Sequence, residues 1–369
     1  KIYQLAKKEQ NSPQLVKALL YQSKYAMDLE EDAELLIVQR LEKELSESSF
    51  PTQNILESIL ANLYWQYFQE NRWQFYDRTE TNEKVDAADF RTWDLKTIFK
   101  EIQVHFEKSL ANENLLQSTD MSVFEAILIT TPEHKTYQPT LYDFLAHQAL
   151  DFYQTDENSI SQPAFKFEMK DPLLLADYDT FSSLTLTTPD TMSLSFQALQ
   201  LYQKLTLFHR NRTDKSPLIL LDIDRLHFVN DHGVMNDKEH LFFETIKISQ
   251  SRNISHQAGT LYDFEMANVY KNQGNTYSYP SNLGEQWKLK SAIEVCGNAI
   301  KRFPESWGAQ KCANLQNEIL LPKLSLQTES FLPENKAARI KVEYTNLEHL
   351  EFQVCKVNAK TKKNFQSIY

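Results

Sequence analysis

The chain has 369 residues, of which 41% are hydrophobic, so it can bury a core as one elongated domain or as two to three compact ones. Only six residues are glycine, which argues against glycine-rich nucleotide-binding folds and turn-rich β-sandwiches. The net charge of −11 argues against a nucleic-acid partner, because phosphate binding needs a basic surface. No apolar run reaches the about 18 residues of a membrane span, so none is expected.

Helical patterns dominate the chain as far as residue 320. Ser12 as N-cap and Pro13 as first helical residue predict one helix start, and Thr92 as N-cap predicts another. In the first of these helices Val16, Leu20 and Met27 fall on one face, with Leu19 beside them, and this spacing predicts the buried face.

Residues 63–81 concentrate aromatic side chains on a predicted helix. We interpret them as a buried joint between helices, because large aromatic residues more often fill helix interfaces than bind ligands. A buried Trp73 would make Trp73→Ala cost about 3–5 kcal/mol. An exposed set of rings would instead favour a sugar- or peptide-binding platform. The joint consists of Tyr64, Trp65, Tyr67, Phe68, Trp73, Phe75 and Tyr76.

Residues 161–188 lack helical periodicity and alternate in part, which predicts an extended excursion across the helices, with or without short strands. The sequence that follows contains Asp190, Thr191 and Met192, which match a short motif for bacterial O-glycosylation at Thr191. A simpler interpretation is that Asp190 or Thr191 caps the next helix, and we favour it because short motifs often match by chance.

Residues 258–312 resemble a tetratricopeptide repeat, a pair of helices that pack closely through small residues. The loop between its two helices is longer than that repeat allows. The matching positions are Ala267, Tyr270, Gly274, Ala292, Ala299 and Pro304.

Cys296 and Cys312 flank the turn at Pro304 and would lie on adjacent antiparallel helices. A disulfide between them is a hypothesis for an oxidising compartment, and two buried free thiols are the alternative.

Residues 218–233 resemble the diguanylate cyclase motif, in which two aspartates at a strand end hold metal and nucleotide. Asp222 and Asp224 fall at the right positions, but no Gly-Gly-Asp/Glu-Glu-Phe hairpin follows. We therefore predict that residues 218–230 are helical and that Asp222 and Asp224 hold no metal. His227, His232 and His240 lie nearby at irregular spacing, so a zinc site is a weaker hypothesis.

After residue 321 the apolar residues alternate, which predicts β-strands over residues 324–357. Two or three strands cannot bury a sandwich core by themselves. We expect them to pair as a hairpin, to rest on the last helices, or to leave an apolar face uncovered.

Seven segments in chain order carry a resemblance to a known family. They are AKKEQNSPQLVKALLY, LANLYWQYFQENRWQFYDRTET, WDLKTI, PTLYDFLAHQALDF, LTTPDTMSLSFQAL, AIKRFPESWGAQKC and LSLQTESFLPENKAARIKVEYTNLEHLEFQV. In this order they resemble the N-terminal region of very large bacterial α2-macroglobulin-like proteins, over nearly the whole chain. The resemblance implies a helical region followed by macroglobulin β-sandwich domains, in a secreted, periplasmic or lipid-anchored protein.

Members of that family are described as protease traps. A protease cuts a bait segment, and a thioester formed by a Cys and a Gln then captures it. No Cys-x-Glu-Gln occurs here, since Cys355 is followed by Lys356, Val357 and Asn358. Protease inhibition is therefore not assigned to these residues.

These observations predict a mainly α chain. Residues 1–320 would form stacked helical hairpins, a tetratricopeptide-like solenoid, and residues 321–369 would begin an incomplete β-sandwich domain. The expected function is a non-enzymatic scaffold, without cofactor, that binds the rest of its own chain, another extracytoplasmic protein or a protease. Two alternatives stay open: a metal- or nucleotide-dependent enzyme using Asp222 and Asp224, and a sugar- or peptide-binding module using residues 63–81.

Overall fold

The computed structural model describes the chain from residue 1 to residue 352, except residues 80, 82–83, 129–130, 156–164, 191, 330, 332–335 and 338. The described residues are mainly helical. The first half contains α1 (Ile2–Lys8), α2 (Ser12–Leu29), α3 (Ala33–Glu47), α4 (Thr52–Tyr76), α5 (Leu95–Ser109), α6 (Glu113–Ser118), α7 (Pro132–Tyr137) and α8 (Leu141–Tyr153).

The second half continues in the same way and ends in two strands. It contains α9 (Tyr178–Ser182), α10 (Leu194–Arg210), α11 (Ser216–His232), α12 (Lys238–Arg252), α13 (Thr260–Asn275), α14 (Lys288–Arg302), α15 (Trp307–Leu320), β1 (Lys323–Thr328) and β2 (Ile340–Thr345).

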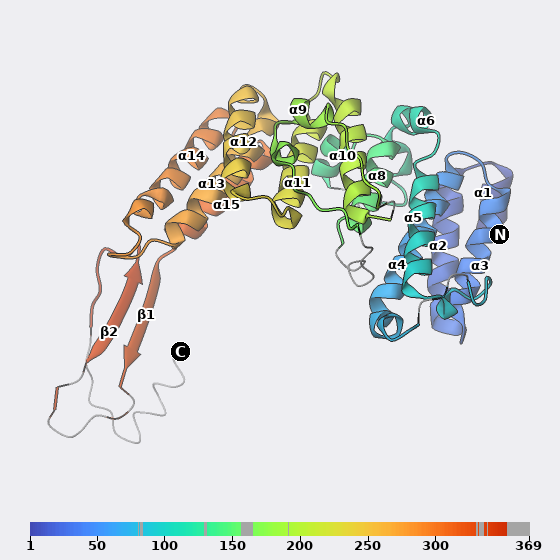
Figure 1. Cartoon of the computed structure of the whole chain (residues 1–369), viewed down its shortest axis with the longest axis horizontal. Coiled ribbons are helices and arrows are strands. Elements are labelled where there is room, and N and C mark those ends of the chain that lie inside the picture. The colour runs from blue at the N-terminus through green and yellow to red at the C-terminus, as the bar shows by residue number, and fades with distance from the viewer. Residues whose placement is uncertain are drawn as a thin grey trace.

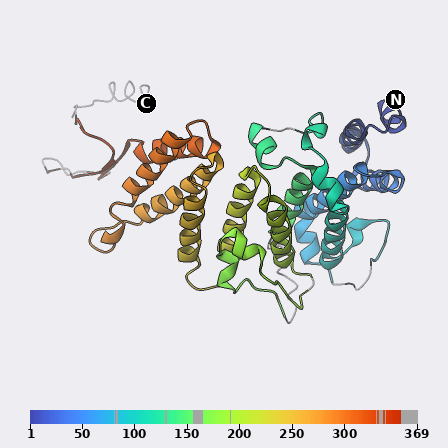
Figure 2. The same cartoon turned by 90° about the horizontal axis from the view of Figure 1, so that it is seen from above.

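The helices follow one another along the long axis of the molecule, from the N-terminal helices at one end to the β-hairpin at the other (Figures 1 and 2). Most of the apolar core is one continuous cluster that extends from α1 to α13, and a second, smaller cluster lies among α13, α14 and α15. The expected mainly α architecture is therefore correct.

Two helix starts differ from the prediction. The N-cap of α2 is Asn11, whose side chain accepts a hydrogen bond from the backbone N–H of Gln14 at 3.1 Å. The N-cap of α5 is Asp94 rather than Thr92, because the carboxylate accepts from the N–H of Thr97 at 2.7 Å.

The buried face of α2 is also shifted from the predicted one. Val16 and Leu19 are buried as predicted, together with Leu15, but Leu20 and Met27 are 42% and 55% exposed. The core-facing stripe therefore lies slightly to one side of the residues that the spacing alone selects.

The predicted excursion is present in its described part, residues 165–188, but it contains no strand there. It includes a 3₁₀ turn, η4 (Pro172–Leu175), and the short helix α9. Thr245 on α12 donates a hydrogen bond to the carbonyl of Leu175 at 2.6 Å, and the N–H of Val234 donates to the carbonyl of Met169 at 3.0 Å. Within the described part of the excursion, these two carbonyl groups are therefore satisfied by α12 and by the loop between α11 and α12 rather than by a neighbouring strand.

Helices α13, α14 and α15 form a compact unit, with close contact between each pair. Ala267, Ala292 and Ala299 are fully buried in it. A Cβ at Gly274 would lie 2.8 Å from the side chain of Leu289, so glycine permits the close approach of α13 and α14. The small residues that suggested a helical repeat thus lie at helix interfaces.

Strands β1 and β2 pair antiparallel as a hairpin that projects from the end of the helical part (Figure 1). Directly paired residues share a face, and one face carries only apolar residues and one threonine. Its pairs are Leu324 with Tyr344, Leu326 with Val342, and Thr328 with Ile340.

The strand prediction is confirmed for part of its range. The described residues 346–352 are not strand, and residues 353–357 lie outside the described part. Among the three arrangements expected for these strands, the structure shows the hairpin together with the uncovered apolar face, since Leu324, Leu326, Ile340 and Tyr344 are 47–60% exposed.

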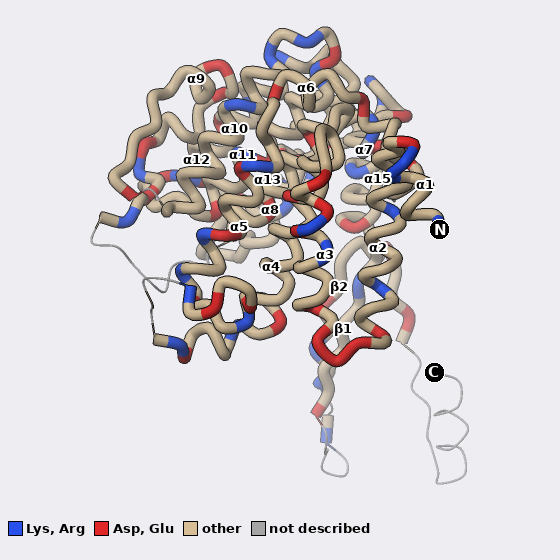
Figure 3. Tube along the Cα trace, turned by 90° about the vertical axis from the view of Figure 1, so that its right-hand side faces the viewer, with Lys and Arg blue, Asp and Glu red and all other residues tan. Residues whose placement is uncertain are grey.

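Within the described part of the chain, no helix is long and apolar enough to cross a membrane. Lys and Arg lie interspersed with Asp and Glu along the described trace in the view of Figure 3.

Candidate functional site

The aromatic residues of α4 form a buried joint with the neighbouring helices. Tyr64, Phe68 and Phe75 are at most 1% exposed, and Trp65 and Tyr67 are half-buried. The ring centroid of Phe68 lies 4.9 Å from that of Phe99 on α5 in an edge-on contact. Tyr76, also half-buried, contacts Phe68 at 6.3 Å. The interpretation of a structural joint therefore suits six of the seven predicted residues.

Trp73 is the exception, since it is 76% exposed and the prediction that it is buried is wrong. The reason is the helical spacing: Phe75 follows Phe68 by seven residues and shares its face, whereas Trp73 follows Tyr64 by nine residues and lies on the opposite face. Helix α4 also has a break at Asn71, whose φ of −115° and ψ of 18° are not helical. The Asn71 side chain donates to the carbonyl of Tyr67 at 3.0 Å.

Arg78, which follows the aromatic joint, contacts a backbone carbonyl and a ring of the joint. Arg78 donates from Nη1 to the carbonyl of Trp93 at 2.5 Å, and its guanidinium lies 4.6 Å from the ring centroid of Phe75. One exposed indole does not make the platform of several rings that a sugar-binding site would need.

The segment around Asp222 is helical, as predicted, and forms most of α11. Asp222 is 1% exposed and accepts hydrogen bonds from Arg225 at 2.5 Å and from the hydroxyl of Tyr262 at 2.7 Å. Arg225, also fully buried, donates in addition to the carbonyls of Leu174 at 2.5 Å and Ala176 at 2.8 Å. This group ties α11 to η4 and α13, and every one of its charges is paired.

Asp224 points to a different side of the same helix. Residues two apart on an α-helix project about 200° apart, whereas residues two apart on a strand share a face. Asp222 and Asp224 therefore do not act together, and the geometry of the cyclase motif is not formed.

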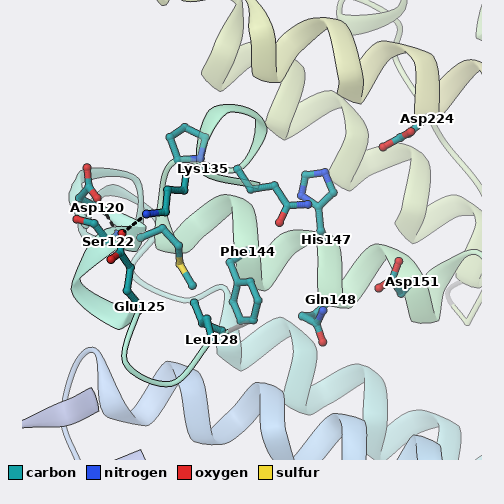
Figure 4. Close-up of a pocket in the computed structure, with 13 residues that line it drawn as sticks. Asp120, Ser122, Glu125, Leu128, Lys135, Phe144, His147, Gln148, Asp151 and Asp224 are labelled. Atoms are coloured by element: carbon teal, nitrogen blue, oxygen red, sulfur yellow. Dashed lines mark hydrogen bonds and ion pairs between the residues drawn. The ribbon is translucent and has the colours of Figure 1, made fainter. Parts of the chain in front are cut away.

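Asp224 instead lines a pocket of about 590 Å³ between α8, α11 and the segment from Asp120 to Leu128 (Figure 4). In Figure 4 Asp224 and Asp151 lie on the same side of His147, and they come from two different helices. A second hollow of about 330 Å³ shares these three residues and adds Tyr202, His227, Asp231 and His232.

Burial of the Asp224 carboxyl group raises its pKa to about 6. Positive charge on His147, His227 and Lys311 opposes this shift, and Glu265 adds to it. Asp151 is more exposed, and partial desolvation raises its pKa as well. Neither carboxylate has a hydrogen bond or an ion pair with any residue that the structure describes.

His147 is oriented by its own helix. Its Nδ1 lies 2.8 Å from the carbonyl oxygen of Asp143. Because a carbonyl only accepts, Nδ1 carries the proton and Nε2 of the neutral ring is left as an acceptor. His227 is bound through Nε2 to a carboxylate of Glu265 at 2.9 Å, and this hydrogen bond raises the pKa of His227.

Among the described residues, no three His, Cys, Asp or Glu side chains converge closely enough to hold a metal ion. Asp224, His227 and His232 were candidates from the sequence, whereas His147 and Asp151 were not.

His147 and Asp151 are four residues apart on a predicted helix, so the sequence does indicate that they share a face. Their meeting with α11 depends on tertiary packing.

Cys296 on α14 and Cys312 on α15 are both fully buried and free in this structure. A hydrogen bond between the two thiols, together with burial, raises the pKa of Cys312. The thiols therefore face one another across the helix interface, and the disulfide stays a prediction that intact mass before and after reduction would check.

The proposed glycosylation residue, Thr191, lies outside the described residues. The alternative that Asp190 or Thr191 caps α10 is wrong, because the N-cap is Ser193, which accepts from the N–H of Phe196 at 3.2 Å. Asp190 instead accepts from the N–H of Phe167 at 3.1 Å and holds the preceding loop.

A scan against protein-family models, a search of curated proteins and a search of solved structures each found no match for this chain.

Proposed function

We propose that this chain is a non-enzymatic helical scaffold of a large extracytoplasmic α2-macroglobulin-like protein, and that its C-terminal end docks another protein segment. The observation that carries the proposal is the uncovered apolar face of the hairpin. Leu326 and Tyr344, for example, are 52% and 60% exposed on that face. Contiguous exposed apolar patches often mark surfaces that bind another protein segment.

The turn between α13 and α14 carries further exposed aromatic residues. Consecutive helices here run antiparallel, so the turn lies at the end of the unit from which β1 departs (Figure 1). Tyr279 and Trp287 in this turn are 78% and 67% exposed. Aromatic residues supply much of the binding energy in protein interfaces, which supports a protein partner.

The hairpin is held at its base in a defined position. The Asn346 side chain donates to the carbonyls of Ile319 at 2.7 Å and Leu321 at 3.3 Å. These hydrogen bonds fix the base of the hairpin to the end of α15, and a docking surface requires such a defined position. A helical region followed by strands with an uncovered face also agrees with what the family resemblance implies, and the extracytoplasmic location follows from that resemblance alone.

Amide hydrogen exchange tests this proposal. We expect fast exchange in β1 and β2 of this chain by itself and strong protection in a polypeptide that also contains the proposed macroglobulin-type domains. Leu326→Ser combined with Tyr344→Ser should abolish that protection. Gln327→Ser combined with Lys341→Ser, on the opposite face, is the matched control and should keep it. Equal exchange of β1 in this chain and in the longer polypeptide would contradict the proposal, as would a natural polypeptide that ends at Tyr369.

The two alternative functions receive less support. The aromatic stretch leaves one ring strongly exposed, that of Trp73, and the Asp222 side chain is fully engaged by Arg225 and Tyr262. Neither arrangement offers the set of accessible groups on which those alternatives depended.

A further inference from the structure

The pocket beside α8 has two ends that differ in how their charges are satisfied (Figure 4). At one end Lys135 and Glu125 form an ion pair at 2.7 Å. At the other end lie Asp151 and Asp224, which have no partner among the described residues. Leu128 and Phe144, with Met121 and Pro139, supply an apolar wall to the same pocket.

The groups at the unpaired end offer acceptors. Two carboxylates accept only, once ionised, and the Nε2 atom of His147 is left as an acceptor by the contact between Nδ1 and Asp143. A largely buried carboxylate without a partner is costly, and Asp224 is in that position. A ligand that brings several N–H donors and a positive charge would remove this cost.

We propose that this end of the pocket binds an organic cation, an ammonium or guanidinium group on an aliphatic stem. The apolar wall would receive the stem, and Asp151, Asp224 and His147 would receive the charged head. A metal ion suits the site less well, because no three potential ligands among the described residues converge on one point. A lysine or arginine side chain of a polypeptide and a free polyamine share this chemistry. The inference does not depend on the hairpin surface proposed above.

The charged groups that face Asp224 from the surrounding helices predict how binding changes with pH. They are Asp151 and His147 on α8, His227, Asp231 and His232 on α11, Glu265 on α13, and Lys311 on α15. As the pH falls below about 6, Asp224 gains a proton and loses its negative charge. This weakens the attraction for a cation, so binding should be strongest above pH 7.

The test measures binding of Nα-acetyl-arginine amide by calorimetry and ligand-detected NMR at pH 7.5. Nα-acetyl-citrulline amide is the control ligand, because it has nearly the same shape without the charge. We expect the arginine amide to bind at least about tenfold more tightly, and Asp224→Asn or Asp151→Asn to remove about that factor. Glu239→Gln, which removes an exposed acidic charge on α12, should leave binding unchanged.

The wild-type protein at pH 5 gives a second measurement that needs no variant, and binding should fall by at least about tenfold there. Spermidine distinguishes the sources: tighter binding of spermidine than of the acetylated amides indicates a free polyamine, and the reverse indicates a polypeptide side chain. Equal binding of the arginine and citrulline amides, or no binding of any cation, would overturn the proposal. So would Zn²⁺ or Mn²⁺ binding that requires Asp151 and Asp224 while the organic cations fail.

Discussion

Asp222 and Asp224 lie two residues apart on α11, yet their surroundings differ in kind. Asp222 is enclosed by Arg225 and Tyr262, and each of its oxygens has a donor. Asp224 faces a pocket and has no partner among the described residues. Burial of a carboxylate therefore does not by itself identify a ligand-binding site. A paired carboxylate stabilises the fold, whereas an unpaired one on a cavity remains available to a ligand.

The largest expected loss of stability follows from removal of the Asp222 carboxylate. Asp222→Ala leaves the buried Arg225 guanidinium with two backbone carbonyls and no counter-charge, and breaking such a pair costs about 3–5 kcal/mol. Urea denaturation at pH 7 would measure this loss. If the variant unfolds at nearly the wild-type urea concentration, the Asp222 group does not hold α11, η4 and α13 together.

The same contrast between an enclosed and an open side chain recurs within α4. Phe68→Ala should cost about 3–5 kcal/mol, because Phe68 is fully buried against Phe75 and Phe99. Trp73→Ala should cost less than about 0.5 kcal/mol, because its ring lies beyond the break at Asn71 and faces solvent. Thermal unfolding of both variants checks the pair, and a larger loss for Trp73→Ala would place the indole in the core after all.

These two helices also show how far the sequence alone predicts the molecule. The period of Ile55, Leu56, Leu60 and Phe68 predicts α4 and its buried face, since helical periodicity is a local property. The break at Asn71 has no equivalent signal, because Asn is tolerated in many helices and its side chain bonds the carbonyl of Tyr67 only in the folded context.

The candidate pocket was less predictable than the fold. His147 and Asp151 lie about seventy residues before Asp224 in the chain, and nothing local relates the two helices. The helical state of residues 218–230 was predictable, and with it the separation of Asp222 from Asp224. Which of the two would face a cavity depends on how α8, α10 and α13 pack around α11.

An intermediate effect is expected at Tyr262, the second donor to Asp222. Tyr262→Phe removes the hydroxyl that lies 2.7 Å from Asp222 and leaves one carboxylate oxygen without a donor. Hydrogen bonds to charged groups contribute about 1.5–3 kcal/mol, and we expect a loss in that range. In a double-mutant cycle with Asp222→Ala the two losses should not add, because they remove one shared interaction. Strictly additive losses would mean that Tyr262 acts through packing alone.

The effect expected at Asp224 has the opposite sign and depends on pH. The pKa of Asp224 is about 6 in the folded chain, above the ordinary value of 3.8, so the folded state holds the proton more tightly than the unfolded state does. Asp224 therefore costs stability once it is ionised above pH 6, and this cost disappears as the pH falls towards 4. Asp224→Asn removes the charge and should stabilise the protein at pH 7.5 by about 1–2 kcal/mol. Near pH 4 the variant and the wild type should have the same stability.

If Asp224→Asn raised the stability equally at both pH values, ionisation of Asp224 would not be what destabilises the wild-type protein. The same variant is expected to lose cation binding. A substitution that raises stability and removes ligand binding identifies a residue that serves binding rather than the fold.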